Sequence, residues 1–272
     1  ENIARAKAEV CAGMRPSSEN FEGHHSALVL SGEDDFTPFI IENFAKPAGI
    51  DVILCGFSSD DDVCATSVEV GEDGCPSFTM TVRSGAQFKT ALAIPGKQSV
   101  GNALYAAAVA AELGIPQFTI DEVFRNLQIT GRRQEVRRAR CGARVIDDSY
   151  NASPESMAAG LDLLATLPCS GTRIAVLGEM GELGDEGRRF HELVGAYAAA
   201  KKPGLVVFVG DENARAMAAA ARMMGLGEDS VAVVPSCDKL IARYGSVLSA
   251  TDLVLVKGSR FVGLDRFVEE VC

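Results

Sequence analysis

Residues 144–164 read RVIDDSYNASPESMAAGLDLL and contain the change of pattern that decides the fold. An apolar run ends in Asp147 and Asp148, and an amphipathic helical pattern begins after Ser153 and Pro154. A serine followed by a proline is a common start of a helix, because the serine side chain caps backbone N–H groups and proline fits the first turn. The stretch therefore predicts a strand, a polar loop and a helix that begins at Pro154.

The chain around and after this stretch repeats one pattern, in which short apolar runs alternate with helical ones. We expect strands near residues 134–138, 143–147, 173–178, 204–210, 230–234 and 251–258. We expect helices near residues 154–167, 185–200, 211–224, 236–248 and 262–271. Strands that alternate with helices form crossover units, so this half predicts a mostly parallel sheet covered on both faces.

The first half of the chain has a different pattern. We expect the following elements in order: a helix over 1–12, a strand and an acidic turn at 26–34, a helix at 35–45 and a strand at 50–57. Residues 63–94 alternate apolar and polar side chains around Gly-Glu-Asp-Gly and Ser-Gly turns, which predicts three antiparallel strands. Two helices should follow, at 99–115 and 119–128, with Ser99 and Thr119 as N-caps.

Length and composition support two α/β domains. The chain has 272 residues, of which 47% are hydrophobic and 23% charged, and these values argue against disorder. The change of pattern places the boundary near residues 131–134. We therefore expect residues 1–130 to form one domain, with a mixed sheet, and residues 131–272 to form the other.

Charge and cysteine content exclude several classes of protein. The net charge of −11 argues against a broad nucleic-acid-binding face, although residues 131–140 form a local basic run that reads as a solvated strand or linker. The eight cysteines include no C-x-x-C pair and there are three histidines, so a zinc site is not expected. Cysteines scattered in this way are typical of a reducing cytoplasm. We expect neither a signal peptide nor insertion into a membrane.

Four loops in the second half follow strands at their carboxyl ends, where open α/β sheets bind ligands. They lie at residues 147–156, 177–186, 209–214 and 256–263. Each loop combines glycine with acidic, amide or hydroxyl side chains, a mixture that ordinary turns and helix caps also use. Four such loops at one sheet edge favour a ligand site.

Two common nucleotide motifs are absent from the sequence. The segment GEMGEL differs from the dinucleotide-binding fingerprint, and Glu179 and Glu182 would repel a pyrophosphate, which argues against NAD. The segment IPGKQSVGN contains Gly96 and Lys97, but Gln98 follows and the first glycine of G-x-x-x-x-G-K-[ST] is replaced by Ala91. The chain therefore contains no phosphate-binding loop of that type.

Several segments together resemble the Mur ligase family across the whole chain. The carriers are ENIARAKAEV, ALVLSGEDD, IPGKQSVGNALYAAAVAAELGI, GRRQEV, VIDDSYNASPESM, AVLGEMGELGDEGRRFHELVG and LVKGSR. The resemblance is greatest to the branch that adds D-alanyl-D-alanine to UDP-N-acetylmuramoyl-tripeptide in peptidoglycan synthesis. It implies that residues 1–130 are the C-terminal part of a central ATP-binding domain, past its phosphate-binding loop. Residues 131–272 would form a Rossmann-like C-terminal domain.

The resemblance also implies a reaction. ATP would phosphorylate the terminal carboxylate of the tripeptide, and the amine of D-alanyl-D-alanine would attack the acyl phosphate, with Mg²⁺ stabilising the transferring group. The chain begins without methionine and in a helical pattern, so we expect it to be a piece of a longer protein. We expect this piece alone to be inactive, monomeric and located in the bacterial cytoplasm.

The resemblance assigns roles to ten residues. Lys7 matches a carbamylated lysine that supports Mg²⁺, and Asn102 matches an adenine contact, although Gln98 and Ser99 replace the usual histidine and asparagine nearby. Arg132 would reach the nucleotide phosphates and Asp148 the ribose hydroxyls. The remaining residues would face the nucleotide, the dipeptide or the substrate peptide, and they are Tyr150, Asn151, Ser153, Lys257, Ser259 and Arg260.

Two alternative functions stay open. One is a related ligase that joins another carboxylate and amine. The other is a nucleotide- or peptide-binding module without catalysis. His191, within the helix expected at 185–200, is interpreted as structural in each case.

Overall fold

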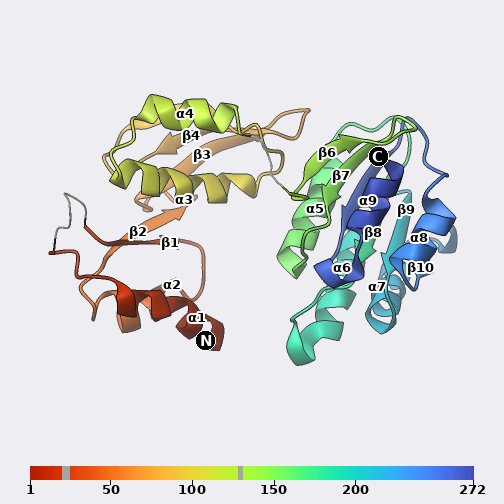
Figure 1. Ribbon diagram of the computed structural model, residues 1–272, viewed down its shortest axis with the longest axis horizontal. Coiled ribbons are helices and arrows are strands. Elements are labelled where there is room, and N and C mark those ends of the chain that lie inside the picture. Colours follow the sequence, from red (N-terminus) through yellow and green to blue (C-terminus); the bar gives the residue numbers. More distant parts are fainter. Residues whose placement is uncertain (20–24, 128–130) are drawn as a thin grey trace. The chain divides into compact units, whose positions relative to one another are not determined.

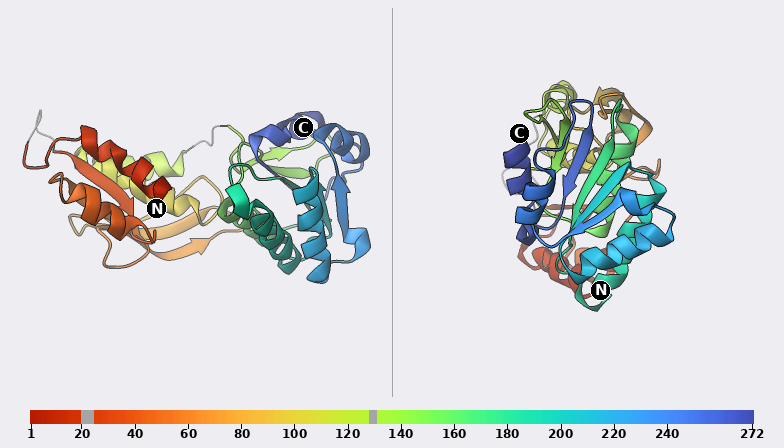
Figure 2. Two further views of the ribbon diagram at one scale, coloured as in Figure 1. Left: turned by 90° about the horizontal axis from the view of Figure 1, so that it is seen from below. Right: turned by 90° about the vertical axis from the view of Figure 1, so that its right-hand side faces the viewer.

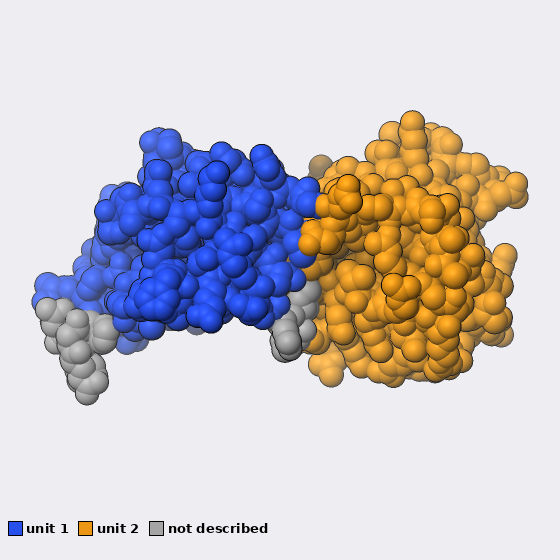
Figure 3. All heavy atoms as spheres, turned by 90° about the horizontal axis from the view of Figure 1, so that it is seen from above, with its two compact units in different colours: residues 1–71, 75–93, 97–127 blue, residues 72–74, 94–96, 128–272 orange. Residues whose placement is uncertain are grey.

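The computed structural model describes residues 1–19, 25–127 and 131–272, and these form two compact units (Figures 1 and 3). Unit 1 comprises Glu1–Gly71, Cys75–Ala93 and Lys97–Leu127, and unit 2 comprises Glu72–Gly74, Ile94–Gly96 and Gln128–Cys272. The first expected domain ends at residue 130, which lies outside the described ranges. The domain assignment therefore stays a prediction.

Unit 1 contains a five-stranded mixed sheet in the order β1-β2-β3-β4-β5. Its strands are β1 (Ala27–Ser31), β2 (Asp51–Gly56), β3 (Val63–Val70), β4 (Pro76–Thr81) and β5 (Gln87–Ala91). The pairs β1–β2 and β2–β3 are parallel, whereas β3, β4 and β5 pair antiparallel. The three antiparallel strands expected within residues 63–94 are thus confirmed.

In the described part of unit 1, four α-helices accompany this sheet, and among them α3 contributes the largest set of buried apolar side chains to the shared core. They are α1 (Asn2–Ala8), α2 (Thr37–Ile40), α3 (Ser99–Glu112) and α4 (Gln117–Arg125). The expected N-caps were wrong. Gln98, not Ser99, precedes α3, and α4 begins after Pro116, two residues before Thr119. The extended backbone of Pro116 explains the earlier start, since its fixed φ leads directly into a first helical turn.

Unit 2 contains a six-stranded sheet in the order β10-β9-β8-β11-β7-β6. Its strands are β6 (Glu135–Arg138), β7 (Arg144–Asp148), β8 (Arg173–Gly178), β9 (Leu205–Val209), β10 (Val231–Val234) and β11 (Leu253–Lys257). Every pair is parallel except the one between β6 and β7. The mostly parallel sheet predicted from the alternating pattern is confirmed.

Helices cover both faces of this sheet, and each face has its own apolar core (Figures 1 and 2). One face packs against α5 (Pro154–Thr166), α6 (Gly187–Ala200) and α7 (Glu212–Met223). The other packs against α8 (Cys237–Tyr244) and α9 (Asp265–Val271). No helix in the described parts of the chain is long and apolar enough to cross a membrane.

The helix α5 begins where the opening stretch predicts. The Ser153 hydroxyl accepts the backbone N–H of Ser156 at 3.3 Å, and the Ser156 hydroxyl accepts that of Ser153 at 2.9 Å. Pro154 occupies the first turn, where its missing N–H leaves no helical bond unmade. This reciprocal cap fixes the point at which the chain leaves the loop after β7.

Candidate functional site

The carboxyl ends of four parallel strands meet at one edge of the sheet in unit 2. In this sheet β11 lies between β7 and β8, so Lys257 is level with Asp148 on one side and Leu177 on the other. The strand β9 continues the same edge beyond β8. The four loops that follow these strands therefore converge, as their sequence positions predict.

Two glycines allow neighbouring loops to approach closely. A β-carbon on Gly258 would lie 2.9 Å from the Cα of Gly178, which is closer than real side chains come. Any other residue at either position would push apart the loops that follow β8 and β11. Glycine at strand ends thus sets the spacing of the site.

A buried ion pair occupies the centre of this edge. Asp148 is 6% exposed and Lys257 is 2% exposed, and the Lys257 Nζ lies 2.8 Å from the Asp148 carboxylate. The same Nζ donates to the backbone carbonyl of Asn151 at 3.0 Å. Burial raises the pKa of Asp148, although the charge of Lys257 and the backbone N–H of Gln134 act in the opposite direction. Lys257 therefore contacts the chain's own groups rather than a surface open to substrate.

The neighbouring aspartate, Asp147, lies on the other face of the sheet. Asp147 is 1% exposed, and its Oδ1 accepts the hydroxyl of Ser149 at 2.6 Å. Its Oδ2 makes no hydrogen bond among the described residues and faces the Arg137 guanidinium at 3.8 Å. The alternation of side chains along β7 thus separates the two adjacent carboxylates.

Glu179 places a carboxylate at the beginning of α7. Its Oε1 accepts the backbone N–H of Asp211 at 2.8 Å and that of Ala214 at 3.2 Å. In dinucleotide-binding proteins with a parallel sheet, such N–H groups and the dipole at the beginning of a helix bind the phosphates. The Glu179 side chain fills that position and so occupies the donors that a phosphate would need.

His191 and Ser259 hold the loop after β8. The Nε2 of His191 accepts the N–H of Met180 at 2.8 Å, so its Nδ1 carries the proton and donates to the carbonyl of Gly187 at 2.6 Å. The Ser259 hydroxyl accepts the N–H of Gly181 at 2.9 Å. His191 is fully buried, and its structural interpretation is supported by these contacts.

Arg132 lies at the beginning of unit 2 and pairs with the final helix. Its guanidinium forms ion pairs with Asp265 and, at 2.8 Å, with Glu269. Its carbonyl accepts the N–H of Tyr150 at 3.2 Å. The guanidinium of Arg133 lies 4.6 Å from the centre of the Tyr150 ring, which is a cation–π distance.

The structure thus brings eight of the ten predicted residues together in unit 2. They are Arg132, Asp148, Tyr150, Asn151, Ser153, Lys257, Ser259 and Arg260. Lys7 on α1 and Asn102 on α3 are exposed residues of unit 1. Sequence reasoning did not single out Gln134 or the anchoring role of Glu179, because both depend on contacts with distant segments.

Across residues 1–19, 25–127 and 131–272, no group of three or more His, Cys, Asp or Glu side chains could hold a metal ion. Lys7 is exposed near the end of α1. These residues therefore do not form a Mg²⁺ site by themselves.

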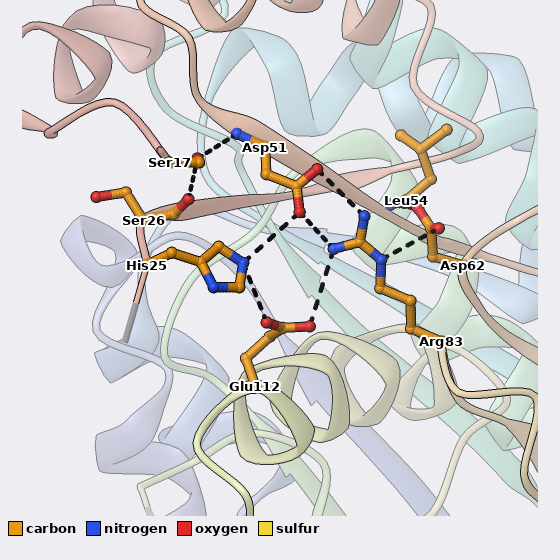
Figure 4. Close-up of polar contacts among 8 residues, drawn as sticks. All are labelled: Ser17, His25, Ser26, Asp51, Leu54, Asp62, Arg83 and Glu112. Carbon is orange, nitrogen blue, oxygen red and sulfur yellow. Dashed lines mark hydrogen bonds and ion pairs between the residues drawn. The ribbon is translucent and has the colours of Figure 1, made fainter. Parts of the chain in front are cut away.

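Unit 1 has a separate polar cluster, which Figure 4 shows around Arg83. Arg83 donates to Asp51 at 3.1 Å and lies 3.9 Å from Glu112, and His25 lies 3.5 Å from Glu112. The hydrogen bond from Arg83 is the main cause that lowers the pKa of Asp51. The contacts connect β2, the turn between β4 and β5, and the end of α3, so the cluster is explained as a structural brace.

An apolar cavity of about 200 Å³ lies at the opposite end of the sheet in unit 2. It is lined by the first residues of β8 and β9 and by side chains of α8 and α9, including Ile174, Leu205, Tyr244 and Phe267. Its position near the amino ends of the strands separates it from the polar loops. The candidate nucleotide site is therefore the loop edge and not this cavity.

Comparison with known proteins gives two family matches and several relatives. Residues 1–110 match the Mur ligase middle domain, and residues 131–260 match the domain described as "Mur ligase, glutamate ligase domain". The UDP-N-acetylmuramoyl-tripeptide–D-alanyl-D-alanine ligase of Mycobacterium tuberculosis strain H37Rv is 33% identical over 284 residues. That match covers 97% of this chain and 52% of the relative.

Two further comparisons agree. The ligase of the same name from Bacillus subtilis is 28% identical over 271 residues, covering 100% of this chain and 55% of that protein. A crystal structure of MurF from Acinetobacter baumannii has a TM-score of 0.78 at 26% identity, covering 98% of this chain and 54% of that one. The chain spans about half the length of the curated relatives it matches.

Proposed function

The chain belongs to the Mur ligase family, and we propose that it is part of an ATP-dependent ligase that adds D-alanyl-D-alanine to UDP-N-acetylmuramoyl-tripeptide. The observation that carries this proposal is the 33% identity to a ligase of that name along 97% of the chain. The convergence of four polar loops at one sheet edge supports the proposal, because open α/β sheets bind ligands at this edge. Residues 1–130 would be the C-terminal part of the middle domain, and residues 131–272 the C-terminal domain.

Asp148 and Arg132 are the proposed nucleotide contacts in unit 2. ATP, when bound, supplies the phosphoryl group that activates the peptide carboxylate for attack by the amine. Asp148 is the proposed partner of the ribose hydroxyls, because a carboxylate can accept about four hydrogen bonds. A phosphate at Arg132 would have to displace the carboxylates of Asp265 and Glu269. The planar guanidinium suits either partner.

Exposed groups of the same loops are the proposed contacts of the two substrates. Arg260 is exposed at the end of the loop after β11, where it can bind a carboxylate. Tyr150 and Asn151 are exposed in the loop after β7, and Ser153 closes that loop. The buried position of Lys257 gives it a different task, whereas the hydroxyl of Ser259 can still donate a hydrogen bond.

Two proposed groups belong to unit 1. Asn102 is exposed on α3 and is proposed to contact the adenine. Lys7 is proposed as the site of a carbamate that supports Mg²⁺, but the described residues form no metal site around it. We further propose that the protein acts as a monomer in the bacterial cytoplasm, in keeping with its scattered cysteines.

The test uses the product of the complete gene with ATP and Mg²⁺. Phosphate release should require both UDP-N-acetylmuramoyl-tripeptide and D-alanyl-D-alanine, and single amino acids should not replace the dipeptide. Release with another amine or another carboxylate would favour a related ligase. Nucleotide binding without phosphate release under any of these conditions would contradict the proposal and favour a binding module.

A further inference from the structure

The segment at the beginning of unit 2 has an unusual backbone. Arg132 has a φ of 60° and Gln134 a φ of 58°, and both carry side chains that disfavour this left-handed region. Gly131, just before them, has a φ of 78°. Such conformations persist only where surrounding contacts hold them. The question is which contacts hold residues 131–134.

Two contacts connect this segment to the loop after β7. The backbone N–H of Gln134 acts on the carboxylate of Asp148 and lowers its pKa. The carbonyl of Arg132 accepts the N–H of Tyr150 at 3.2 Å. The strained segment and residues 148–150 are therefore connected by one main-chain hydrogen bond and by the attraction between the Gln134 N–H and the Asp148 carboxylate.

Lys257 also contacts the Asp148 side chain and holds it in place. Its Nζ lies 2.8 Å from Asp148 and donates to the carbonyl of Asn151 at 3.0 Å, so one cation holds both ends of the turn. Its aliphatic part is packed, since a β-carbon on Gly160 would lie 3.3 Å from the Lys257 Cδ. With 2% exposure it has little freedom to turn towards a ligand.

We propose that Lys257 is a positioning residue, which through Asp148 and the carbonyl of Asn151 holds residues 131–134 and the loop after β7 in one arrangement. A ligand that hydrogen-bonds to the Asp148 carboxylate then competes with the N–H of Gln134. Binding at the sheet edge is therefore coupled to the conformation of residues 131–134. Removal of the cation should loosen both segments without changing the sheet. The part that concerns nucleotide affinity rests on the proposed function, whereas the coupling itself does not.

The first measurement is amide hydrogen exchange of the 272-residue chain, resolved by NMR, with no ligand present. Lys257→Met should exchange roughly tenfold faster at Gln134 and Tyr150, while amides within β8 and β9 keep their protection. The matched control is Lys201→Met, because Lys201 forms a 2.6 Å pair with Asp162 on the exposed surface of the same unit. Unchanged exchange at Gln134 and Tyr150 in a folded Lys257→Met protein would overturn the proposal.

A second variant covers the case in which Lys257→Met does not fold because it leaves a buried carboxylate without its cation. The double variant Asp148→Leu and Lys257→Met removes both charges and keeps apolar volume, which buried pairs often tolerate. Its amides at Gln134 and Tyr150 should exchange as fast as in the single variant. Wild-type protection at both amides in this protein would equally contradict the proposal.

The affinity for ADP gives a readout that a purely structural lysine would not change. In the protein encoded by the complete gene, Lys257→Met should bind ADP roughly tenfold more weakly in a calorimetric titration, because Asp148 is no longer held in place. Lys201→Met should bind like the wild type. If the exchange result holds but no variant or wild-type chain binds ADP, the proposed nucleotide site fails and the positioning role stands. If ADP binds equally well to Lys257→Met and to the wild type, the positioning role for the nucleotide is wrong.

Discussion

Two adjacent aspartates show how the position of a side chain on a strand decides what its carboxylate does. Asp147 faces Arg137 on one side of the sheet, and Asp148 faces Lys257 on the other. For Asp148, burial raises the pKa despite the nearby cation. A buried ion pair whose desolvation exceeds its attraction lowers stability. The ion pair of Asp148 with Lys257 is therefore better explained by its role in positioning the loop after β7 than by a contribution to folding stability.

The raised pKa of Asp148 predicts a pH dependence of stability. The folded protein binds this proton more tightly than the unfolded chain, so the stabilising contribution is complete below the ordinary aspartate pKa and is lost as pH rises through the raised value. Lys257, Asp147 and the N–H of Gln134 are the groups that act on this carboxyl. Asp148→Asn should thus gain unfolding free energy relative to wild type as the pH rises from the ordinary aspartate pKa through the raised value, at about 1.4 kcal/mol per unit of pKa difference.

Urea unfolding across that pH range measures this difference. Asp162→Asn, an exposed partner of Lys201, controls for effects of pH that the whole protein shares. If Asp148→Asn were instead less stable than wild type by an amount that grows with pH, the ion pair would be a net source of stability and this explanation would be wrong.

Removal of the Glu179 carboxylate should create a phosphate-binding site at the beginning of α7. Glu179→Ala leaves the N–H groups of Asp211 and Ala214 without their acceptor and should reduce the unfolding free energy by about 1–2 kcal/mol. Phosphate should restore part of that loss, because it can bind the same helix terminus. Thermal unfolding in phosphate and in chloride of equal ionic strength tests this. The exposed neighbour Glu182→Gln should show neither effect, and an equal response to phosphate in both variants would count against the explanation.

At the scale of single elements, the sequence was most informative where local chemistry alone decides the outcome. Ser153 and Pro154 fix the beginning of α5 through contacts within four residues, and this element was predicted with its cap. The N-cap of α3 was missed by one residue and the beginning of α4 by two, since Pro116 outweighs the capping tendency of Thr119. Both helices also end three residues before the expected positions, at Glu112 and Arg125. Contacts such as Lys257 with Asp148 could not be predicted, because they depend on β11 lying between β7 and β8.

The cap of α5 gives a prediction at this scale. Ser153→Ala removes the acceptor of the Ser156 N–H and should reduce the unfolding free energy by about 1 kcal/mol. Ser153→Asp should keep most of the stability, because a carboxylate also accepts this N–H and faces the positive end of the helix. Chemical denaturation of the three proteins provides the measurement. Equal stability of the alanine variant and the wild type would show that the cap contributes little.

At the scale of the whole molecule, the family assignment rests on matches to both units, while the chain spans about half the length of its relatives. The 272-residue sequence contains no G-x-x-x-x-G-K-[ST] segment for the triphosphate. We therefore predict that this chain by itself releases no phosphate from ATP, even with both substrates. A phosphate assay on the pure chain measures this, and sustained turnover would show that another segment binds the triphosphate.

The most direct test of the account is mass spectrometry of the reaction product formed by the protein encoded by the complete gene. With ATP, Mg²⁺, UDP-N-acetylmuramoyl-tripeptide and D-alanyl-D-alanine, we predict a new species whose mass equals that of the two substrates joined with loss of one water. The same species should be absent when ATP is omitted. If the tripeptide stays unchanged while ATP is consumed with a different amine or carboxylate, the assignment to D-alanyl-D-alanine addition is contradicted.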